Sequence, residues 1–123
     1  MNNAIEIDVK AHYIEDQSRP DEDKYVYAYT IRISNKGSET VQLLSRKWRI
    51  LDGNNNEQIV QGLGVVGEQP RILPGESYNY TSGLVLATTS GTMNGTYMMQ
   101  DDSGKEFDVQ IPTFALVQPQ ALH

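Results

Sequence analysis

The sequence predicts an all-β protein whose strands pack as an immunoglobulin-like or fibronectin type III-like β-sandwich. Apolar residues alternate with polar ones in nearly every apolar segment, and no segment has a convincing helical period. Turn signals recur at intervals of roughly 8–12 residues, as in a two-sheet sandwich. The 123 residues are enough for one core and too few for two ordinary domains, so we expect a single domain over 1–123, with an ordered core of about 4–117.

The first two strands are predicted from strict alternation. Apolar side chains occupy every odd position over 5–13, which is typical of a half-buried strand. A polar stretch with one proline and three acids predicts a loop over 17–24. Tyrosines and isoleucines then take the odd positions over 25–33, and the Asn-Lys-Gly signal at 35–37 predicts the turn that ends this second strand.

The third strand changes parity along its length. Apolar residues keep odd positions as far as Leu43 and then take even positions from Leu44 to Ile50, which predicts a bulge or a bend. The Asp-Gly-Asn-Asn-Asn run at 52–56 predicts a turn, and a short strand starting near Ile59 leads into a glycine-rich segment.

The C-terminal half continues the same pattern. Pro-Gly at 74–75 predicts a type II turn, and alternating tyrosines predict the strand that follows it. Residues 87–92 are expected to form a loop, and 95–100 with 107–111 a hairpin. Pro112 is expected to end the last strong strand, with Phe114 and Leu116 as a final apolar anchor and a loose tail from Gln118.

Composition excludes several classes of function. The chain has no cysteine, which rules out disulfides, thiolate metal sites and a cysteine nucleophile. A net charge of −6 argues against nucleic-acid binding. No apolar run is long enough for a membrane helix, and the N-terminus lacks the basic region of a signal peptide. We expect a soluble cytoplasmic protein, either a monomer or a weak homodimer.

The segment from Gly62 to Gly67 matches the G-x-G-x-x-G pattern of dinucleotide sites. Two prolines and a glycine follow within nine residues and prevent a helix, and the acidic residue expected about 20 positions on is absent. We therefore expect no tight binding of NAD or ATP. The alternatives are a structural loop that needs close backbone approach, an anion-binding loop, or a protein contact with an exposed Val65 or Val66 as its anchor.

The only basic cluster surrounds Trp48. We expect Trp48 to be the core tryptophan of the sandwich, with Lys47 and Arg49 on the solvent face. Arg46 lies on the apolar parity and needs a partner for its guanidinium, which leaves a cation–π or anion-binding role open.

Signals for metal binding and for catalysis are weak. The turn at 52–56 starts like a calcium loop, but Glu57 replaces the glycine that such a loop needs. The acids at 21–23 and 101–102 could hold a hydrated divalent cation weakly, and His12 and His123 lack the spacing of a ligand pair. No G-x-S-x-G motif is present. We expect weak binding of magnesium or cobalt at most, no bound cofactor and no enzymatic activity.

Several stretches spread over about 5–117 resemble the ApaG family. The matching stretches are Tyr13-Ile14, Gln17-Ser18, Tyr27-Ala28-Tyr29-Thr30, Val41-Gln42-Leu43-Leu44-Ser45-Arg46, Trp48, Gly62-x-Gly64-Val65-Val66-Gly67-Glu68-Gln69-Pro70, Pro74-Gly75-Glu76, Tyr80-Thr81-Ser82-Gly83, Gly91-x-Met93-x-Gly95 and Ile111-Pro112-x-Phe114. One departure is Lys47, where the family often has histidine.

The resemblance implies a fibronectin type III-like sandwich without catalytic activity. Bacterial members are linked to cobalt and magnesium tolerance, and eukaryotic members join the domain to F-box and polymerase-interacting proteins. We therefore expect a protein-binding module. The alternative is a role in divalent-cation homeostasis through weak metal or phosphate binding, and a nucleotide hydrolase is the least favoured. The expected contact surface comprises Gly62, Gly64, Val65, Val66, Gly67, Gln69, Pro70 and Arg46.

Two substitutions separate the two halves of this hypothesis. Gly64→Val is expected to abolish partner binding in a folded domain, because a branched side chain would block close approach of a partner to the backbone. Trp48→Ala is expected to unfold the domain, because the loss of a core tryptophan costs about 3–5 kcal/mol.

Overall fold

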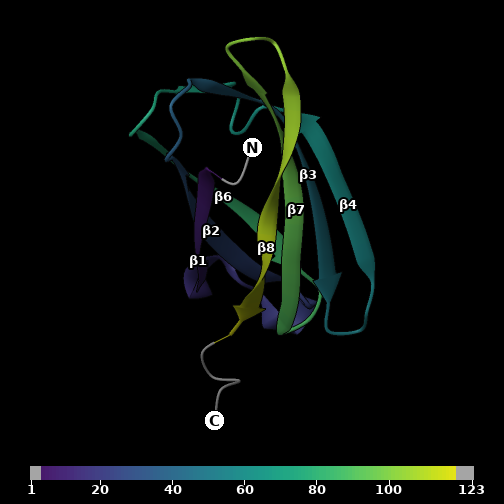
Figure 1. Ribbon diagram of the computed structural model, residues 1–123. Coiled ribbons are helices and arrows are strands. Elements are labelled where there is room, and N and C mark those ends of the chain that lie inside the picture. The colour runs from purple at the N-terminus through teal and green to yellow at the C-terminus, as the bar shows by residue number, and fades with distance from the viewer. Residues whose placement is uncertain (1–3, 119–123) are drawn as a thin grey trace.

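The computed structural model describes residues 4–118 and shows a sandwich of two antiparallel sheets (Figure 1). The three-stranded sheet has the order β1-β2-β6, and the five-stranded sheet has the order β4-β3-β7-β8, with β5 paired to the start of β3. The strands are β1 (Ile5–Tyr13), β2 (Tyr25–Asn35), β3 (Val41–Asp52), β4 (Glu57–Leu63), β5 (Arg71–Ile72), β6 (Ser77–Leu86), β7 (Ser90–Asp101) and β8 (Glu106–Val117). The predicted fold class is confirmed.

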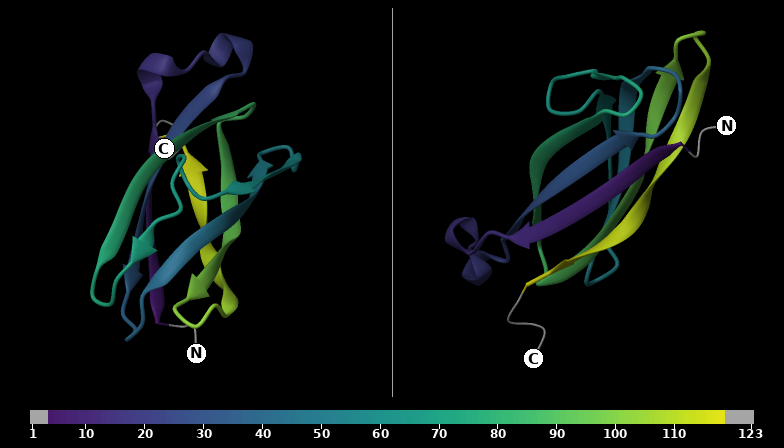
Figure 2. Two further views of the ribbon diagram at one scale, coloured as in Figure 1. Left: turned by 90° about the horizontal axis from the view of Figure 1, so that it is seen from above. Right: turned by 60° about the vertical axis from the view of Figure 1, so that its left-hand side comes forward.

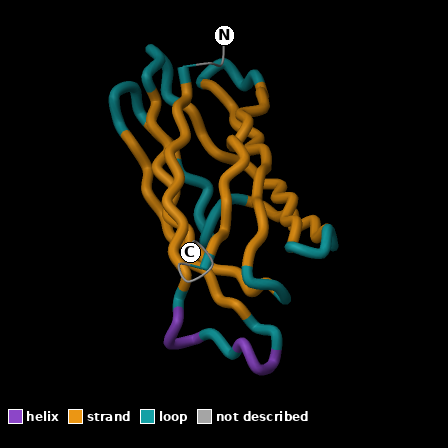
Figure 3. The backbone as a smooth tube through the Cα atoms, turned by 90° about the horizontal axis from the view of Figure 1, so that it is seen from below, coloured by secondary structure: helices purple, strands orange, loops and turns teal. Residues whose placement is uncertain are grey.

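The helical content of residues 4–118 is limited to two 3₁₀ turns, η1 (Glu15–Gln17) and η2 (Pro20–Glu22). They lie together at one end of the sandwich, between β1 and β2 (Figure 3). They overlap the polar loop predicted over 17–24 at Gln17 and over 20–22. Within the described range no helix has the length and apolar character needed to cross a membrane.

Alternation places the core where the sequence predicted it. The odd positions of β2 from Tyr27 to Ile33 are buried between the sheets, and they face Trp48 and other buried side chains of the second sheet. The Tyr27 hydroxyl donates a hydrogen bond of 2.6 Å to the Thr89 carbonyl oxygen, which satisfies its polar end inside this core.

The predicted parity change in β3 is a β-bulge. Leu43 pairs with Met99 and Ser45 pairs with Met98, so Leu44 is the extra residue. The bulge lets both Leu43 and Trp48 point into the core although they differ in parity. It also frees the Leu44 carbonyl oxygen for contacts outside the β3–β7 ladder.

Two predicted boundaries in the C-terminal half are wrong. β7 begins at Ser90, so the loop predicted over 87–92 is limited to 87–89. Pro112 does not end the last strand, because β8 continues to Val117. The register shifts between Met93 and Gly95 of β7, which places Pro112 in a bulge of an edge strand, where its missing N–H is tolerated. The predicted anchor at Leu116 is confirmed, since this side chain is fully buried.

The two sides of the sandwich differ. On one side β1 and β8 lie against each other, as the right-hand view of Figure 2 shows. On the other side β4 and β6 are the outermost strands of their sheets, and a cleft lies between them. The segment 64–70 follows β4 at the end of the sandwich opposite the 3₁₀ turns (Figure 1).

Candidate binding surface at the glycine hairpin

The glycine motif forms the tip of a hairpin, and residues 62–70 are called the glycine hairpin below. Val65 N donates to the Glu68 carbonyl oxygen at 2.8 Å, and Glu68 N donates to the Val65 carbonyl oxygen at 2.9 Å. The two residues between them, Val66 and Gly67, have φ angles of 49° and 79°. Positive φ at both central positions is the pattern of a type I′ turn. As predicted, no helix follows the motif.

Each glycine of the motif has its own structural reason. A Cβ atom at Gly62 would lie 2.9 Å from Arg46 Nη1, and one at Gly64 would lie only 2.1 Å from the Glu68 carbonyl oxygen. Gly67 meets nothing within 4 Å, but its φ of +79° favours glycine. The backbone that approaches Gly64 closely is therefore that of Glu68 in the same chain, and not that of a partner as we predicted.

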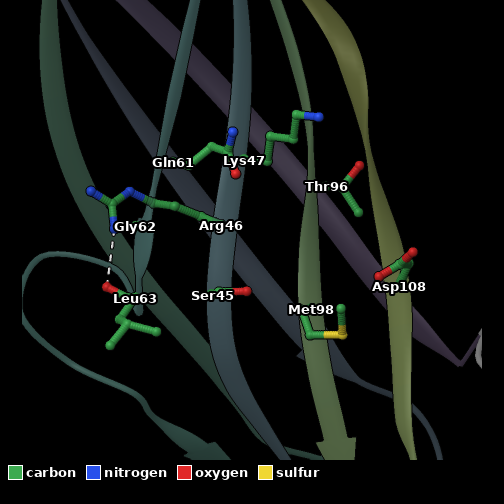
Figure 4. Close-up of a pocket in the computed structure, with 9 residues that line it drawn as sticks. All are labelled: Ser45, Arg46, Lys47, Gln61, Gly62, Leu63, Thr96, Met98 and Asp108. Carbon is green, nitrogen blue, oxygen red and sulfur yellow. Dashed lines mark hydrogen bonds between the residues drawn. The ribbon is translucent and has the colours of Figure 1, made fainter.

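Arg46 finds its partner in the glycine hairpin itself. Its Nη1 donates to the carbonyl oxygens of Leu63 at 3.1 Å and Gly64 at 2.9 Å. Figure 4 shows the side chain running past Gly62 and ending beside Leu63. Arg46 and its two acceptors, which lie 17 and 18 positions further along the chain, thus form one unit. From the sequence we could predict only that the Arg46 guanidinium needs a partner.

The base of the hairpin is fastened to the bulge of β3. The freed Leu44 carbonyl oxygen accepts hydrogen bonds from Gly64 N at 2.8 Å and from Gln69 Nε2 at 2.9 Å. Leu43 N donates to the Pro70 carbonyl oxygen at 3.0 Å. Gln69 and Pro70 thus hold the hairpin in place, whatever else they contact.

The exposed apolar residues of the hairpin differ from the expected pair. Val65 is fully buried in the core, so it presents no surface to a partner. Val66 is 61 % exposed, and Leu63, which we did not single out from the sequence, is 77 % exposed. The exposure of Leu63 follows from its parity in β4. Leu63 pairs with Ser45, an outward-facing residue of β3, so its side chain points to solvent.

A hollow of about 590 Å³ adjoins Leu63 on the outer face of the five-stranded sheet (Figure 4). Lys47 and Asp108 contribute opposite charges to its wall, whereas Leu63 and Met98 contribute apolar surface. The remaining lining residues are Ser45, Arg46, Gln61, Gly62 and Thr96. The hairpin and this hollow form one continuous surface of mixed character.

The rest of the basic cluster lies where the sequence placed it. Trp48 is only 2 % exposed, and its ring packs edge-on against Tyr29, Tyr97 and Phe114 at centroid distances of 5.4, 6.4 and 6.0 Å. Lys47 and Arg49 are on the solvent face, where Arg49 forms an ion pair with Glu57.

Buried tyrosines lie within electrostatic reach of Arg46. Burial raises the pKa of Tyr80 and of Tyr97, whose hydroxyls share a hydrogen bond between the sheets, and the nearby guanidinium opposes this rise. The Arg46 guanidinium thus lies near the hydroxyls of Tyr80 and Tyr97, which stay protonated.

The predicted loop acids do not form a metal centre in the part of the chain that the structure describes. Residues 4–118 contain no group of three or more His, Cys, Asp or Glu side chains placed to hold a metal ion. Asp52 Oδ1 accepts hydrogen bonds from the N–H groups of Asn56 and Asn54, and these bonds, the one from Asn56 most of all, lower the pKa of this carboxyl group. His123 lies outside the described residues. Weak binding of magnesium or cobalt stays a prediction.

Comparison with known proteins places this chain in a family. The family model described as the ApaG domain matches residues 15–101, a range that includes the bulge of β3, the glycine hairpin and Trp48. The chain belongs to the ApaG family.

Individual relatives agree with this assignment. Protein ApaG of Dechloromonas aromatica is 52 % identical over 119 residues, which cover 97 % of this chain and 94 % of the relative. Protein ApaG of Salmonella arizonae is 53 % identical over 117 residues, which cover 95 % and 94 %. The crystal structure of a Bordetella pertussis protein with the name ApaA superposes with a TM-score of 0.92 at 46 % identity, over 94 % of each chain. The resemblance inferred from the sequence is confirmed.

Proposed function

We propose that this ApaG-family protein is a non-enzymatic module that binds a protein partner in the cytoplasm through the glycine hairpin and the adjoining hollow. The observation that carries this proposal is the exposure of Leu63 and Val66. They are the two most exposed large apolar side chains of residues 4–118, and both belong to one hairpin. Apolar side chains gathered at one exposed place are typical of protein contact sites.

Hydrogen bonds within the protein hold the hairpin in its conformation without a partner. Arg46 donates to the Gly64 carbonyl oxygen on one flank, Gln69 on the other flank donates to the Leu44 carbonyl oxygen of β3, and paired bonds between Val65 and Glu68 close the tip. A surface that is already ordered loses little conformational entropy on association. This supports recognition by a preformed shape.

Val66 carries local strain that suits a binding residue. A β-branched side chain in the left-handed region costs about 1–2 kcal/mol relative to a residue that tolerates positive φ. Strain of this kind is concentrated at functional positions. This strain works against the stability of the turn, which favours a role for the exposed valine in contact with another molecule.

The groups on this surface support binding rather than catalysis. The hollow is lined by apolar, hydroxyl, amide and charged side chains, a mixture that is typical of protein contact surfaces. We therefore assign no reaction to it.

Affinity capture from an extract of the cells that make this protein tests the proposal. We expect wild-type protein to retain a partner and Leu63→Ser and Val66→Asn to lose it. Val66→Asn should at the same time raise the melting temperature, because asparagine tolerates positive φ better than valine does. A gain in stability combined with a loss of binding would separate function from folding.

The matched controls are Leu73→Ser and Val85→Ser, since both residues are exposed and apolar but lie outside the hairpin. They should retain the partner. Equal recovery of the partner by the hairpin variants and by these controls would contradict the proposal.

A further inference from the structure

A second cavity of about 430 Å³ opens between β4 and β6, on the open side of the sandwich. It takes Gln58 and Val60 from β4 and Ser82 from β6, while Arg46, Trp48 and Tyr29 come from the strands behind them. These residues belong to both sheets, so the site exists only in the folded protein. Its volume lies within the range of small-ligand sites, about 300–1,000 Å³.

The polar groups of this cleft are strongly biased toward donors. The guanidinium of Arg46 can donate hydrogen bonds, and the hydroxyls of Tyr29 and Ser82, which hydrogen-bond to each other, retain one further proton to donate. No aspartate or glutamate lines the cleft, although the chain has 16 acids and a net charge of −6. The cleft is therefore a locally electropositive region of an acidic protein.

Arg46 has donor capacity left for a ligand. Its hydrogen bonds to the glycine hairpin use only Nη1, while Nε and Nη2 have no hydrogen-bond partner among residues 4–118. The ion pairs of the described residues are Lys24–Glu22, Arg49–Glu57 and Arg71–Asp102, none of which involves Arg46. A guanidinium fixed at one nitrogen, with no acidic partner, is preorganised for an anion.

Trp48 is the second unusual group in the wall. Its Nε1 is the one buried side-chain polar atom within residues 4–118 that has no hydrogen-bond partner. Buried polar groups are normally hydrogen-bonded, so an exception calls for an explanation. Ile50, Val60 and Met93 supply apolar surface in the same cleft.

We propose that this cleft binds a carboxylate attached to an apolar body. The carboxylate pairs with the free side of the Arg46 guanidinium, and the apolar body lies against the side chains near Trp48. This site goes beyond the proposed function, because neither Leu63 nor Val66 lines the cleft. The apolar part distinguishes the expected ligand from inorganic phosphate.

The protein contains a single tryptophan, so one indole N–H resonance in an NMR spectrum reports on the cleft. We expect hexanoate to shift this resonance in a saturable way. Hexylamine, which has the same chain length and the opposite charge, should give no saturable shift. Absence of a saturable shift with hexanoate, or an equal response to both compounds, would overturn the proposal.

Two isosteric substitutions on one strand provide a matched test. Gln58 and Gln61 are both exposed residues of β4, but Gln58 lines this cleft whereas Gln61 lines the hollow on the outer face. Gln58→Glu places a negative charge in the cleft and should weaken hexanoate binding at least about tenfold, whereas Gln61→Glu should change it little. Equal effects of the two substitutions would show that only the overall charge matters, which contradicts a site in the cleft.

Arg46→Lys keeps the positive charge but removes the planar fork, and it should abolish saturation by hexanoate. Because this variant could also loosen the glycine hairpin, Gln58→Glu, which leaves Arg46 unchanged, is the decisive variant. Leu63→Ser and Val66→Asn should bind hexanoate normally. The test of hexanoate binding is therefore independent of the test of partner binding, and either proposal can fail without the other.

The carboxylate could belong to a small organic acid or to the C-terminus of a peptide. A short peptide that ends in leucine, compared with its C-terminally amidated form, distinguishes these sources. Tighter binding of the free-acid peptide than of hexanoate would identify a peptide terminus, and binding no tighter than hexanoate would identify a small acid. Equal saturable shifts with the free-acid and amidated peptides would contradict recognition of a carboxylate.

Discussion

Trp48 and Arg46 lie two positions apart on the same face of β3, yet they stabilise different parts of the molecule. Trp48 fills the space between the sheets and contacts aromatic rings from β2, β7 and β8. Arg46 lies beside Gly62 and hydrogen-bonds to the backbone at the end of β4, at Leu63 and Gly64. Its long side chain lets a charged head reach the edge of the sandwich from an inward-facing position.

At this scale we predict that Trp48→Ala unfolds or nearly unfolds the domain. The substitution removes a side chain that is 98 % buried and leaves a large cavity, at a cost of about 3–5 kcal/mol. Chemical denaturation of the variant measures this loss. Trp48→Phe, which keeps an aromatic ring in place, should cost less, and an Ala variant as stable as the Phe variant would show that the ring contacts contribute little.

At the scale of an element, the glycine hairpin depends on contacts that its own strand cannot supply. The bulge in β3 provides the Leu44 carbonyl oxygen, and Arg46 caps two further carbonyl oxygens. The sequence-based expectation for Gly64→Val changes accordingly. This substitution would not simply block a partner, because its Cβ would collide with the Glu68 carbonyl oxygen of the same hairpin.

We predict that Gly64→Val lowers the melting temperature more than Gly67→Ala does. Both glycines have positive φ, so each substitution adds roughly 1–2 kcal/mol of backbone strain, but only the Gly64 variant adds a steric clash at 2.1 Å. Thermal melts of the two variants make the comparison. Equal melting temperatures would mean that the hairpin moves away from Glu68 without cost to the fold.

At the scale of the whole molecule, the tyrosines between the sheets couple stability to alkaline pH. Burial, together with smaller effects of neighbouring Tyr13 and Tyr25, raises the pKa of Tyr27 to about 12, and burial also raises the pKa of Tyr29. The unfolded chain releases these phenol protons near the ordinary pKa of about 10, before the folded protein does. The free energy of unfolding is therefore independent of these groups below pH 10 and falls as pH rises from about 10 through 12.

Melting temperatures measured from pH 8 to pH 12 test this prediction, with Tyr27→Phe as the matched variant. Phenylalanine cannot ionise, so the decline above pH 10 should be shallower for the variant than for the wild type. Because the variant also loses the hydrogen bond to Thr89, its stability should be lower at pH 8. Parallel curves for the two proteins above pH 10 would contradict the assigned role of Tyr27.

The sequence by itself determined the features that depend on local periodicity and local backbone preference. Alternation identified β1 and β2, the burial of Trp48 and the parity change that becomes the bulge at Leu44. The Pro-Gly pair predicted the turn in which Gly75 has a φ of +82°. These features follow from side-chain direction along a strand and from φ limits, which a few neighbouring residues decide.

Only the tertiary structure decided which residues meet. It buried Val65 and exposed Val66, because the type I′ turn reverses the chain between Val65 and Glu68. It extended β8 through Pro112 because a bulge on an edge strand does not need the missing N–H. It also gave Arg46 a backbone partner and gathered donor groups from both sheets into one cleft. Burial and hydrogen bonding depend on segments far apart in the chain, and local residue patterns carry no record of which distant segments lie beside them.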